Sequence, residues 1–233
     1  MNGVQVNDVQ VAEENGNTVT SRVRIDIRDI TRIAIFAAII AVLGIPGAIP
    51  AFGGAVPITA QTLGVMLAGA VLGSWRGAAA VLTFLALVFV GLPLLSGGRG
   101  GVGVFVGPSV GYLVGWVFGA FVVGAIVQAG GRRPTWWWTA LGCFVGGILV
   151  VYTFGIPLQA LITQLPLPQT ALTSAVFLPG DIVKVVVATV ITVALWRAYP
   201  RAFRLEASGR GSARTESAAT SDTPPARQSE TIE

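Results

Sequence analysis

Two charged side chains stand out because the chain around them is almost entirely apolar. No acidic residue occurs from Ile33 to Gly180, and Asp181 then lies three positions before Lys184, the only lysine in the sequence. Each such charge costs about 2.5–3.5 kcal/mol to insert into a membrane, so it needs a partner or a purpose. At i, i+3 on a helix the two side chains share one face and can meet. The pattern therefore predicts that this face lines a binding site.

Composition indicates that the surrounding chain is a membrane protein. Hydrophobic residues make up 53% of the 233 residues and charged residues 11%, which excludes an ordinary soluble domain. Several apolar runs approach the roughly 20 residues that a helix needs to cross a bilayer. The net charge of +4 lies mostly in the ends and short loops, which is typical of membrane orientation and not of nucleic-acid binding. We therefore expect an all-α polytopic membrane protein in the cell membrane.

Six transmembrane helices are predicted along the chain. Their approximate ranges are residues 30–43, 57–72, 78–92, 107–128, a fifth span that follows residue 135 and ends near 154, and 180–199. Residues 73–77 are predicted to form a tight turn, and residues 155–176, with three prolines and no charge, to fold back against the bundle. Residues 1–21 and 205–233 are polar and aperiodic, which predicts disorder. The domain organisation is thus a six-helix membrane domain, residues 22–204, between a disordered N-terminal segment and a disordered cytoplasmic tail.

The arginines predict the orientation of these spans. With six helices, both termini share one side, and that side carries the arginines at 22–32, 76, 132–133 and 197–204, while the opposite loops hold Arg99 alone. The positive-inside rule therefore places both termini in the cytoplasm. It also brings Arg99, Asp181 and Lys184 together near the outer face. Because the rule disfavours an arginine there, we expect Arg99 to serve a ligand.

Polar side chains from other spans could complete this cluster. Thr59 and Gln61 lie at the start of the second span. Because lipid offers no hydrogen bonds, we expect both side chains to face protein or a cavity. A structural role and a ligand-binding role fit them equally. Tyr112 lies one turn into the fourth span and fits a pocket wall or an anchor at the membrane interface. A matching ligand would carry N–H donors for the carboxylate, a carbonyl or carboxylate for the two cations, and an otherwise apolar surface.

The charged pair could also have a structural or a catalytic role. Pro179-Gly180-Asp181 can start a helix, with the carboxylate as a first-turn acid and Lys184 as its neutralising neighbour. Enzymatic chemistry has little support, because the chain has no histidine and its single cysteine, Cys143, lies in an apolar run. We expect no metal site and no cofactor. A Ser–Lys dyad of Lys184 with Ser96 or Ser109 is not excluded by the residues alone.

Small residues at four-residue spacing mark two helix faces. In the first span Ala34 pairs with Ala38 and Ala37 with Ala41; such faces leave a smooth groove for another helix, inside or outside the protein. In the fourth span, glycines occupy positions 107, 111, 115 and 119. This second stripe predicts a seam of close helix packing within the chain.

Four motifs, in this order along the chain, resemble the BioY family. They are PITAQTLGVMLAG at 57–69, GLP at 91–93 with GGRGG at 97–101, GPSVGYL at 107–113, and PGDIVK at 179–184. Members of this family are biotin-binding membrane (S) components of energy-coupling-factor (ECF) transporters. The resemblance covers about residues 28–196. The sequence departs from the family at Ser109-Val110, where Thr-Gly is common, and at Ala60, where leucine is common, which weakens the carry-over of a ligand role to Ser109.

The resemblance implies a six-helix S-component fold, high-affinity biotin capture on the outer side, and uptake driven by a partner module. That module has a transmembrane coupling subunit and two ABC-type ATPases. Family knowledge also implies that Asp181, Lys184 and Arg99 contact the ligand. Biotin is then the transported ligand and the chain is not an enzyme. The alternatives are an S component for another small vitamin, a membrane enzyme that uses Lys184 as a base, and a packing subunit without a ligand.

In the family the first helix meets the coupling subunit through its small-residue faces. The resemblance therefore favours an external partner for the four alanines of the first span, which are Ala34, Ala37, Ala38 and Ala41.

Overall fold

The computed structural model describes residues 27–45, 59–131 and 134–199. The predicted disordered segments, residues 1–21 and 205–233, and residues 46–58, between the first two predicted spans, lie outside these ranges. Within them the regular structure is helical, apart from one isolated bridge between Leu95 and Arg99. The all-α prediction is therefore confirmed for the described part of the chain.

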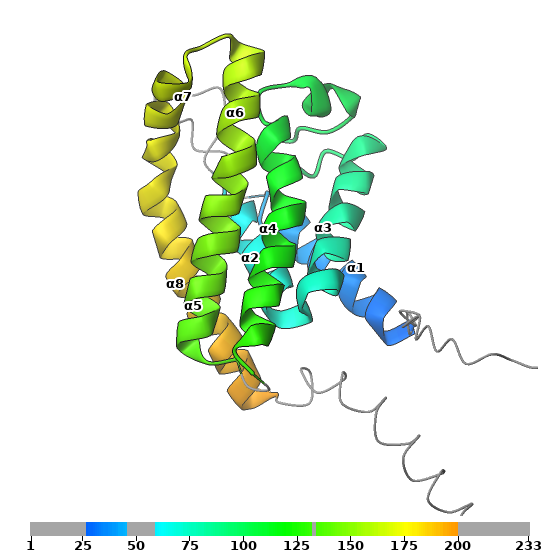
Figure 1. Cartoon of the computed structure of the whole chain (residues 1–233). Helices are drawn as coiled ribbons and strands as arrows, with labels where there is room; N and C mark the ends of the chain where they lie inside the picture. Colours follow the sequence, from blue (N-terminus) through cyan, green and yellow to red (C-terminus); the bar gives the residue numbers. More distant parts are fainter. Residues whose placement is uncertain (1–26, 46–58, 132–133, 200–233) are drawn as a thin grey trace, which may run out of the picture.

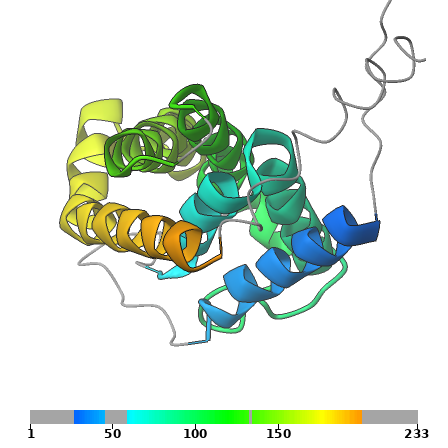
Figure 2. The same cartoon turned by 90° about the horizontal axis from the view of Figure 1, so that it is seen from below.

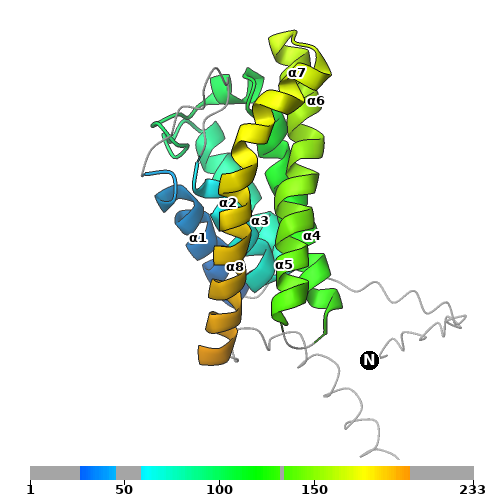
Figure 3. The same cartoon turned by 90° about the vertical axis from the view of Figure 1, so that its left-hand side faces the viewer.

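Eight α-helices form an elongated bundle (Figure 1). They are α1 Ile27–Val42, α2 Gln61–Leu72, α3 Ser74–Phe89, α4 Val110–Ala129, α5 Trp136–Phe144, α6 Val151–Thr163, α7 Leu167–Ser174 and α8 Leu178–Ala198. A π-helical segment, Val145–Val150, joins α5 to α6, and a 3₁₀ turn, Ala175–Phe177, joins α7 to α8. Figure 3 shows that each of these pairs forms one long helical rod, and Figure 2 shows α1 on the opposite side of α2 and α3 from α6.

Three helical stretches are long and apolar enough to cross a membrane. They are Val110–Ala129, Trp136–Thr163 and Leu167–Ala198. The apolar helices α2 and α3 are shorter, with 12 and 16 residues, or about 18 and 24 Å at 1.5 Å per residue. The described chain is thus a membrane-type helical bundle that combines long and short helices.

The sequence-based boundaries were wrong in two places. Residues 73–77 do not form a turn: α3 begins at Ser74, and Gly73 alone, with a φ of +85°, reverses the chain. Residues 155–176 do fold back, but as a helical hairpin, because α6 continues through Pro157 to Thr163. Gln164 then takes the left-handed conformation that ends a helix, and Pro166 precedes α7 where no backbone donor is required.

Glycines allow α4 to pack directly on the backbone of its neighbour. A Cβ on Gly115 would lie 2.9 Å from Cα of Val151, and one on Gly119 would lie 2.6 Å from the carbonyl oxygen of Gly146. These distances are closer than ordinary Cβ contacts, so a side chain there would force the two helices apart. The predicted seam is confirmed from Gly111 to Gly119, whereas Gly107 has only an ordinary contact at 3.7 Å.

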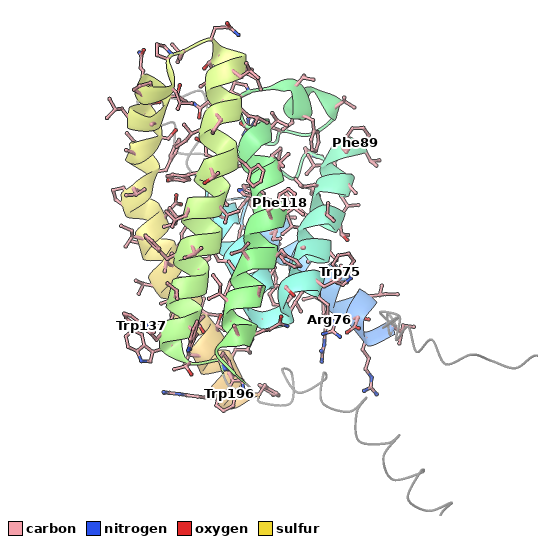
Figure 4. The ribbon with its side chains drawn as sticks, in the orientation of Figure 1. Trp75, Arg76, Phe89, Phe118, Trp137 and Trp196 are labelled. Carbon is pink, nitrogen blue, oxygen red and sulfur yellow. The ribbon has the colours of Figure 1, made fainter. Side chains whose placement is uncertain are left out.

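One end of the bundle carries cations and indoles. Asp29 of α1 forms an ion pair with Arg76 of α3, with 3.0 Å between Oδ1 and Nε. Figure 4 shows Trp137 and Trp196 at the lower end of the molecule, with Trp75 and Arg76 also in its lower part. Indole and guanidinium groups are enriched where a membrane meets water. This end therefore has the composition of a membrane interface.

Candidate ligand-binding site

A cavity inside the bundle contains all six residues that the sequence suggested for ligand binding. Its walls come from α2, α4, α6, α8, the turn after α3 and the π-helical segment. The empty space amounts to about 640 Å³, including the open mouth. The predicted residues that line it are Thr59, Gln61, Arg99, Tyr112, Asp181 and Lys184, and the other lining residues are Thr62, Leu95, Ser109, Leu113, Trp116, Gly147, Val151, Tyr152 and Phe177.

Asp181 and Lys184 form a nearly buried ion pair on α8. Nζ of the lysine lies 2.9 Å from Oδ1 of the aspartate, and the side chains of Lys184 and Asp181 are 15% and 7% exposed. Lys184 also donates to Oγ1 of Thr62 at 2.8 Å, while the hydroxyl of Tyr152 donates to Oδ2 of Asp181 at 2.7 Å. Each carboxylate oxygen thus has one fixed donor and keeps a second acceptor position.

This geometry differs from that of a helix cap. Asp181 lies in the first turn of α8, but no side chain caps this helix end within the described residues. The carboxylate oxygens bind Lys184 and Tyr152 instead. A 3₁₀ turn and α7 precede the helix, so its N-terminus is continuous with further helical structure. The pair is therefore directed into the cavity and not used to terminate the helix.

Arg99 reaches the cavity from a tight turn after α3. Two backbone bonds between Leu95 and Arg99, at 3.0 and 3.2 Å, close this turn. Gly97 and Gly98 adopt φ values of +80° and +71°, which glycine reaches without steric cost. Nε of Arg99 donates to the carbonyl of Ser96 at 3.3 Å, and within the described residues its four remaining N–H groups have no protein acceptor.

The amide of Gln61 is committed to the protein itself. This side chain is fully buried, and its Nε2 donates to the carbonyls of Ile40 at 3.3 Å and Leu94 at 3.0 Å. Its Oε1 accepts the backbone N–H of Ser96 at 3.0 Å. Gln61 therefore fastens the turn that carries Arg99 to α1 and α2, which is a positioning role and not the direct ligand contact that its place in the sequence allowed.

Tyr112 and Thr59 hold different places in the cavity wall. The hydroxyl of Tyr112 donates to Oε1 of Gln159 at 2.8 Å and lies 2.9 Å from Oγ of Ser174, so it links α4 to α6 and α7. Its ring meets the rings of Tyr152 and Phe177 edge to face. Tyr112 thus offers mainly an aromatic surface. Thr59 is half-buried just before α2 and lines the cavity.

Tyr152 is the main site residue that the sequence analysis missed. It lies in an apolar run, one residue after the backbone passes from the π-helical segment into α6. Such a segment adds a residue to one turn and changes which side chains face inward. In the sequence, the only signal of this π-helical segment is the neighbouring pair Gly146 and Gly147, because glycines permit the wider turn. Trp116, Val151 and Phe177 were also missed, since apolar wall residues look like ordinary core.

The four alanines of α1 do not share one environment. Ala34 and Ala38 are exposed, whereas Ala37 is 2% exposed and belongs to the core of the chain. Ala41 is half-buried and packs against that core. Because Ala37 is covered by its own protein, only Ala34 and Ala38 present a small-residue surface to the outside.

Catalytic arrangements find no support around Lys184. Its hydrogen bonds go to Asp181 and Thr62, and no bond to Ser96 or Ser109 exists in the described ranges. In the same ranges, no three His, Cys, Asp or Glu side chains come together in a way that could hold a metal ion. The groups that Lys184 and Asp181 present in the cavity can bind a polar molecule through hydrogen bonds and charge.

Comparison with known proteins identifies close relatives. The chain is 50% identical over 181 residues to the biotin transporter BioY of Rhodobacter capsulatus, covering 73% of this chain and 95% of the relative. It is 46% identical over 180 residues to the biotin transporter BioY of Rhizobium etli, covering 74% and 95%. The probable biotin transporter BioY of Bacillus subtilis is 41% identical over 174 residues, covering 73% and 91%.

A solved structure and a family model agree with these relatives. The crystal structure of the S-component for biotin from an ECF-type ABC transporter superposes with a TM-score of 0.70 and 33% identity, covering 73% of this chain and 92% of that chain. The model of the BioY family matches residues 16–201. The resemblance carried by the four sequence motifs is thereby confirmed, and this chain belongs to the BioY family.

Proposed function

We propose that this chain is the biotin-binding membrane subunit of an ECF-type transporter. One observation carries the proposal: among the described residues that line the cavity, the charged side chains are one carboxylate, Asp181, and two cations, Lys184 and Arg99. These three groups sum to a formal charge of +1. A charge that is removed from water is costly unless it is compensated. The cavity therefore suits a ligand with a single negative charge, and biotin carries one carboxylate.

The unused hydrogen-bonding positions match the polar groups of biotin. The carboxylate of Asp181 keeps one acceptor position on each oxygen, and the ureido ring of biotin has two N–H donors. Lys184 uses two of its three protons on protein and has one left for the ureido carbonyl. The free N–H groups of Arg99 can bind the carboxylate of the valerate chain in a bidentate manner. Each polar group of the ligand thus has a named partner.

The remaining walls match the apolar part of the ligand. Trp116, Val151 and Phe177 line the cavity, and the rings of Tyr112 and Tyr152 meet edge to face, with 6.3 Å between their centroids. Small-molecule sites commonly combine such apolar walls with a few polar groups that fix orientation. The thioether ring and the methylene chain of biotin would bury apolar surface against these side chains.

The proposed topology has six membrane crossings with both termini in the cytoplasm. Three helical rods meet the length requirement by themselves, and we assign the other three crossings to α1, α2 and α3. The arginine-rich and tryptophan-rich end of the bundle supports a cytoplasmic location for that end. Arg99 lies in the turn after α3, so in this proposed topology the cavity would lie toward the outer face.

Energy for uptake would come from a partner module. The only lysine of the chain lies in PGDIVK and not in a Gly-Lys-Ser/Thr phosphate-binding motif. The exposed face of α1 at Ala34 and Ala38 would let another helix approach closely. We assign this face to the transmembrane coupling subunit, which in turn would bind the two ABC-type ATPases.

A thermal-shift screen of vitamins against the purified chain tests the proposal. A ligand that binds only the folded state raises the melting temperature. Biotin should stabilise the protein, and thiamine and riboflavin should not, because neither supplies a carboxylate. The Asp181→Asn and Lys184→Ala variants should lose the biotin-dependent shift. Stabilisation by another vitamin, or an unchanged biotin shift in both variants, would reject the assignment.

A further inference from the structure

A second hollow lies on the outer surface of the bundle, between α5 and α8. It is lined by Trp136 and Ala140 of α5 and by eight residues of α8 from Val185 to Ala198, and its empty space is about 1330 Å³, including the open side. Figure 3 shows α8 running beside the rod of α5 and α6 in this region. No lining residue is shared with the central cavity. We call this hollow the α5–α8 groove.

The chemistry of the α5–α8 groove is that of an amphiphile site. Its walls are valine, alanine and one indole, and its one hydroxyl, on Thr189, already donates to the carbonyl of Val185 at 2.7 Å. Among the described residues of its lining, the only charged side chain is Arg197, which is exposed at one end. Within the part of the chain that the structure describes, this guanidinium has no hydrogen bond or ion pair. The groove therefore offers a long apolar surface that ends in one available cation.

The length of the α5–α8 groove corresponds to one leaflet of a bilayer. From Val185 to Ala198 a helix rises about 20 Å. Half of the hydrocarbon core is about 15 Å, and the headgroup layer adds about 5 Å more. When the apolar walls lie in the hydrocarbon, Arg197 and the exposed Trp136 fall at the headgroup level. That position is typical of both side chains in membrane proteins.

We propose that the α5–α8 groove binds an anionic glycerophospholipid from the leaflet at this end of the molecule. One acyl chain lies along the apolar walls of α8, and the phosphate group meets Arg197. Zwitterionic lipids carry a phosphate as well, so the selection rests on net charge: the cation of Arg197 at the headgroup level attracts a lipid with net negative charge more strongly than a zwitterionic one. This inference is independent of the ligand in the central cavity.

Native mass spectrometry of the full purified chain tests the charge selection. The protein is incubated with phosphatidylglycerol or phosphatidylcholine of identical acyl chains, and the lipids retained per protein are counted. We expect one retained phosphatidylglycerol, and Arg197→Gln should lower the preference for it about fivefold, the contribution of one cation near an anionic lipid. Arg28→Gln removes an exposed cation from α1, outside the groove, and should leave the preference unchanged.

A second pair of variants tests the acyl-chain site. Ala194→Phe fills the groove from an exposed position and should reduce retention of both lipids, whereas Ala86→Phe, on an exposed face of α3, should not. Melting temperatures in lipid-free detergent verify that every variant is folded. Equal retention of the two lipids by the unchanged protein would overturn the proposal. So would equal effects of Arg28→Gln and Arg197→Gln, or lipid retention that Ala194→Phe leaves intact.

Discussion

Two walls of the central cavity are held together in different ways. The wall of α4 and α6 is packed backbone to backbone through glycines, with Gly115 against Val151. The wall of α8 and the Arg99 turn is held by side-chain hydrogen bonds, among them those of Asp181 and Gln61. We call the wall of α4 and α6 the glycine wall, and the wall of α8 and the Arg99 turn the charged wall. We infer that the glycine wall fixes the shape of the cavity, whereas the charged wall supplies its charge. Substitutions in the two walls should therefore have separable effects.

The largest expected effect is on the charged wall. Asp181→Asn removes the carboxylate found among the described lining residues and leaves Lys184 and Arg99 uncompensated. It also replaces one of the two oxygens that would accept the ligand's N–H groups by an NH₂ donor. Truncating one partner of a buried hydrogen-bonded charge pair costs about 2–5 kcal/mol, so biotin affinity should fall at least about 30-fold. Equilibrium binding of labelled biotin measures this loss. A loss below threefold would mean that the carboxylate does not face the ligand.

Gln61→Leu should weaken both stability and binding. The substitution leaves the N–H of Ser96 and the carbonyl of Leu94 without their partner in a buried place, at about 1–3 kcal/mol each. We expect a lower melting temperature and about tenfold weaker biotin binding, because the Arg99 turn loses its anchor. Gln128→Leu is the matched control, since Gln128 is exposed and, within the described residues, its side chain bonds Ser74, outside the cavity. Equal effects of the two variants would contradict the positioning role.

The glycine wall should respond through folding. Gly115→Ala places a Cβ against the backbone of Val151, which cannot move aside as a side chain can, so we expect a loss of about 1–3 kcal/mol in the free energy of unfolding. Gly103→Ala is the control, because a Cβ there meets nothing within 4 Å. Thermal unfolding without ligand measures both variants. A Gly115→Ala protein as stable as the control would remove the distinction between the walls.

The smallest effect should come from a single hydroxyl. Tyr152→Phe keeps the ring but deletes the donor to Oδ2 of Asp181, a bond to a charged group worth about 1.5 kcal/mol. Biotin should bind about tenfold more weakly. Tyr112→Phe deletes a hydroxyl that binds Gln159 and Ser174 instead. It should lower the melting temperature and change biotin affinity little, and the reverse pattern would show that the two rings have been assigned the wrong roles.

The sequence revealed the charged wall because charge is conspicuous in an apolar chain. Asp181 and Lys184 were singled out by their cost in a membrane, and Arg99 by its place on the side that the positive-inside rule disfavours. All three line the cavity. Tyr152 was not found, because its inward direction depends on a π-helical segment whose only mark in the sequence is the pair Gly146 and Gly147. Four-residue spacing likewise cannot tell which face of a helix looks outward, so Ala37 was grouped with Ala34 although it packs inside.

Prolines account for the largest error in the fold. The fifth span was predicted to end near residue 154, and residues 155–176, with three prolines, to fold back against the bundle. Pro157 is accommodated inside α6, and Pro166 and Pro168 lie at the start of α7, where the missing backbone donor has no cost. The packing of α6 against α4 stabilises the helical conformation around Pro157. The local pattern therefore predicted the reversal of the chain but not its helices.

The central claim is that an anionic ligand completes a cavity with a formal charge of +1. Comparing the affinities of biotin and biotin methyl ester for the unchanged protein and for Arg99→Gln tests it most directly, because the ester keeps the ureido and thioether rings and lacks only the charge. The account predicts that the unchanged protein binds the ester far more weakly than biotin, and that Arg99→Gln lowers the affinity for biotin but hardly changes that for the ester. Equal affinities of the unchanged protein for biotin and its ester would contradict the account.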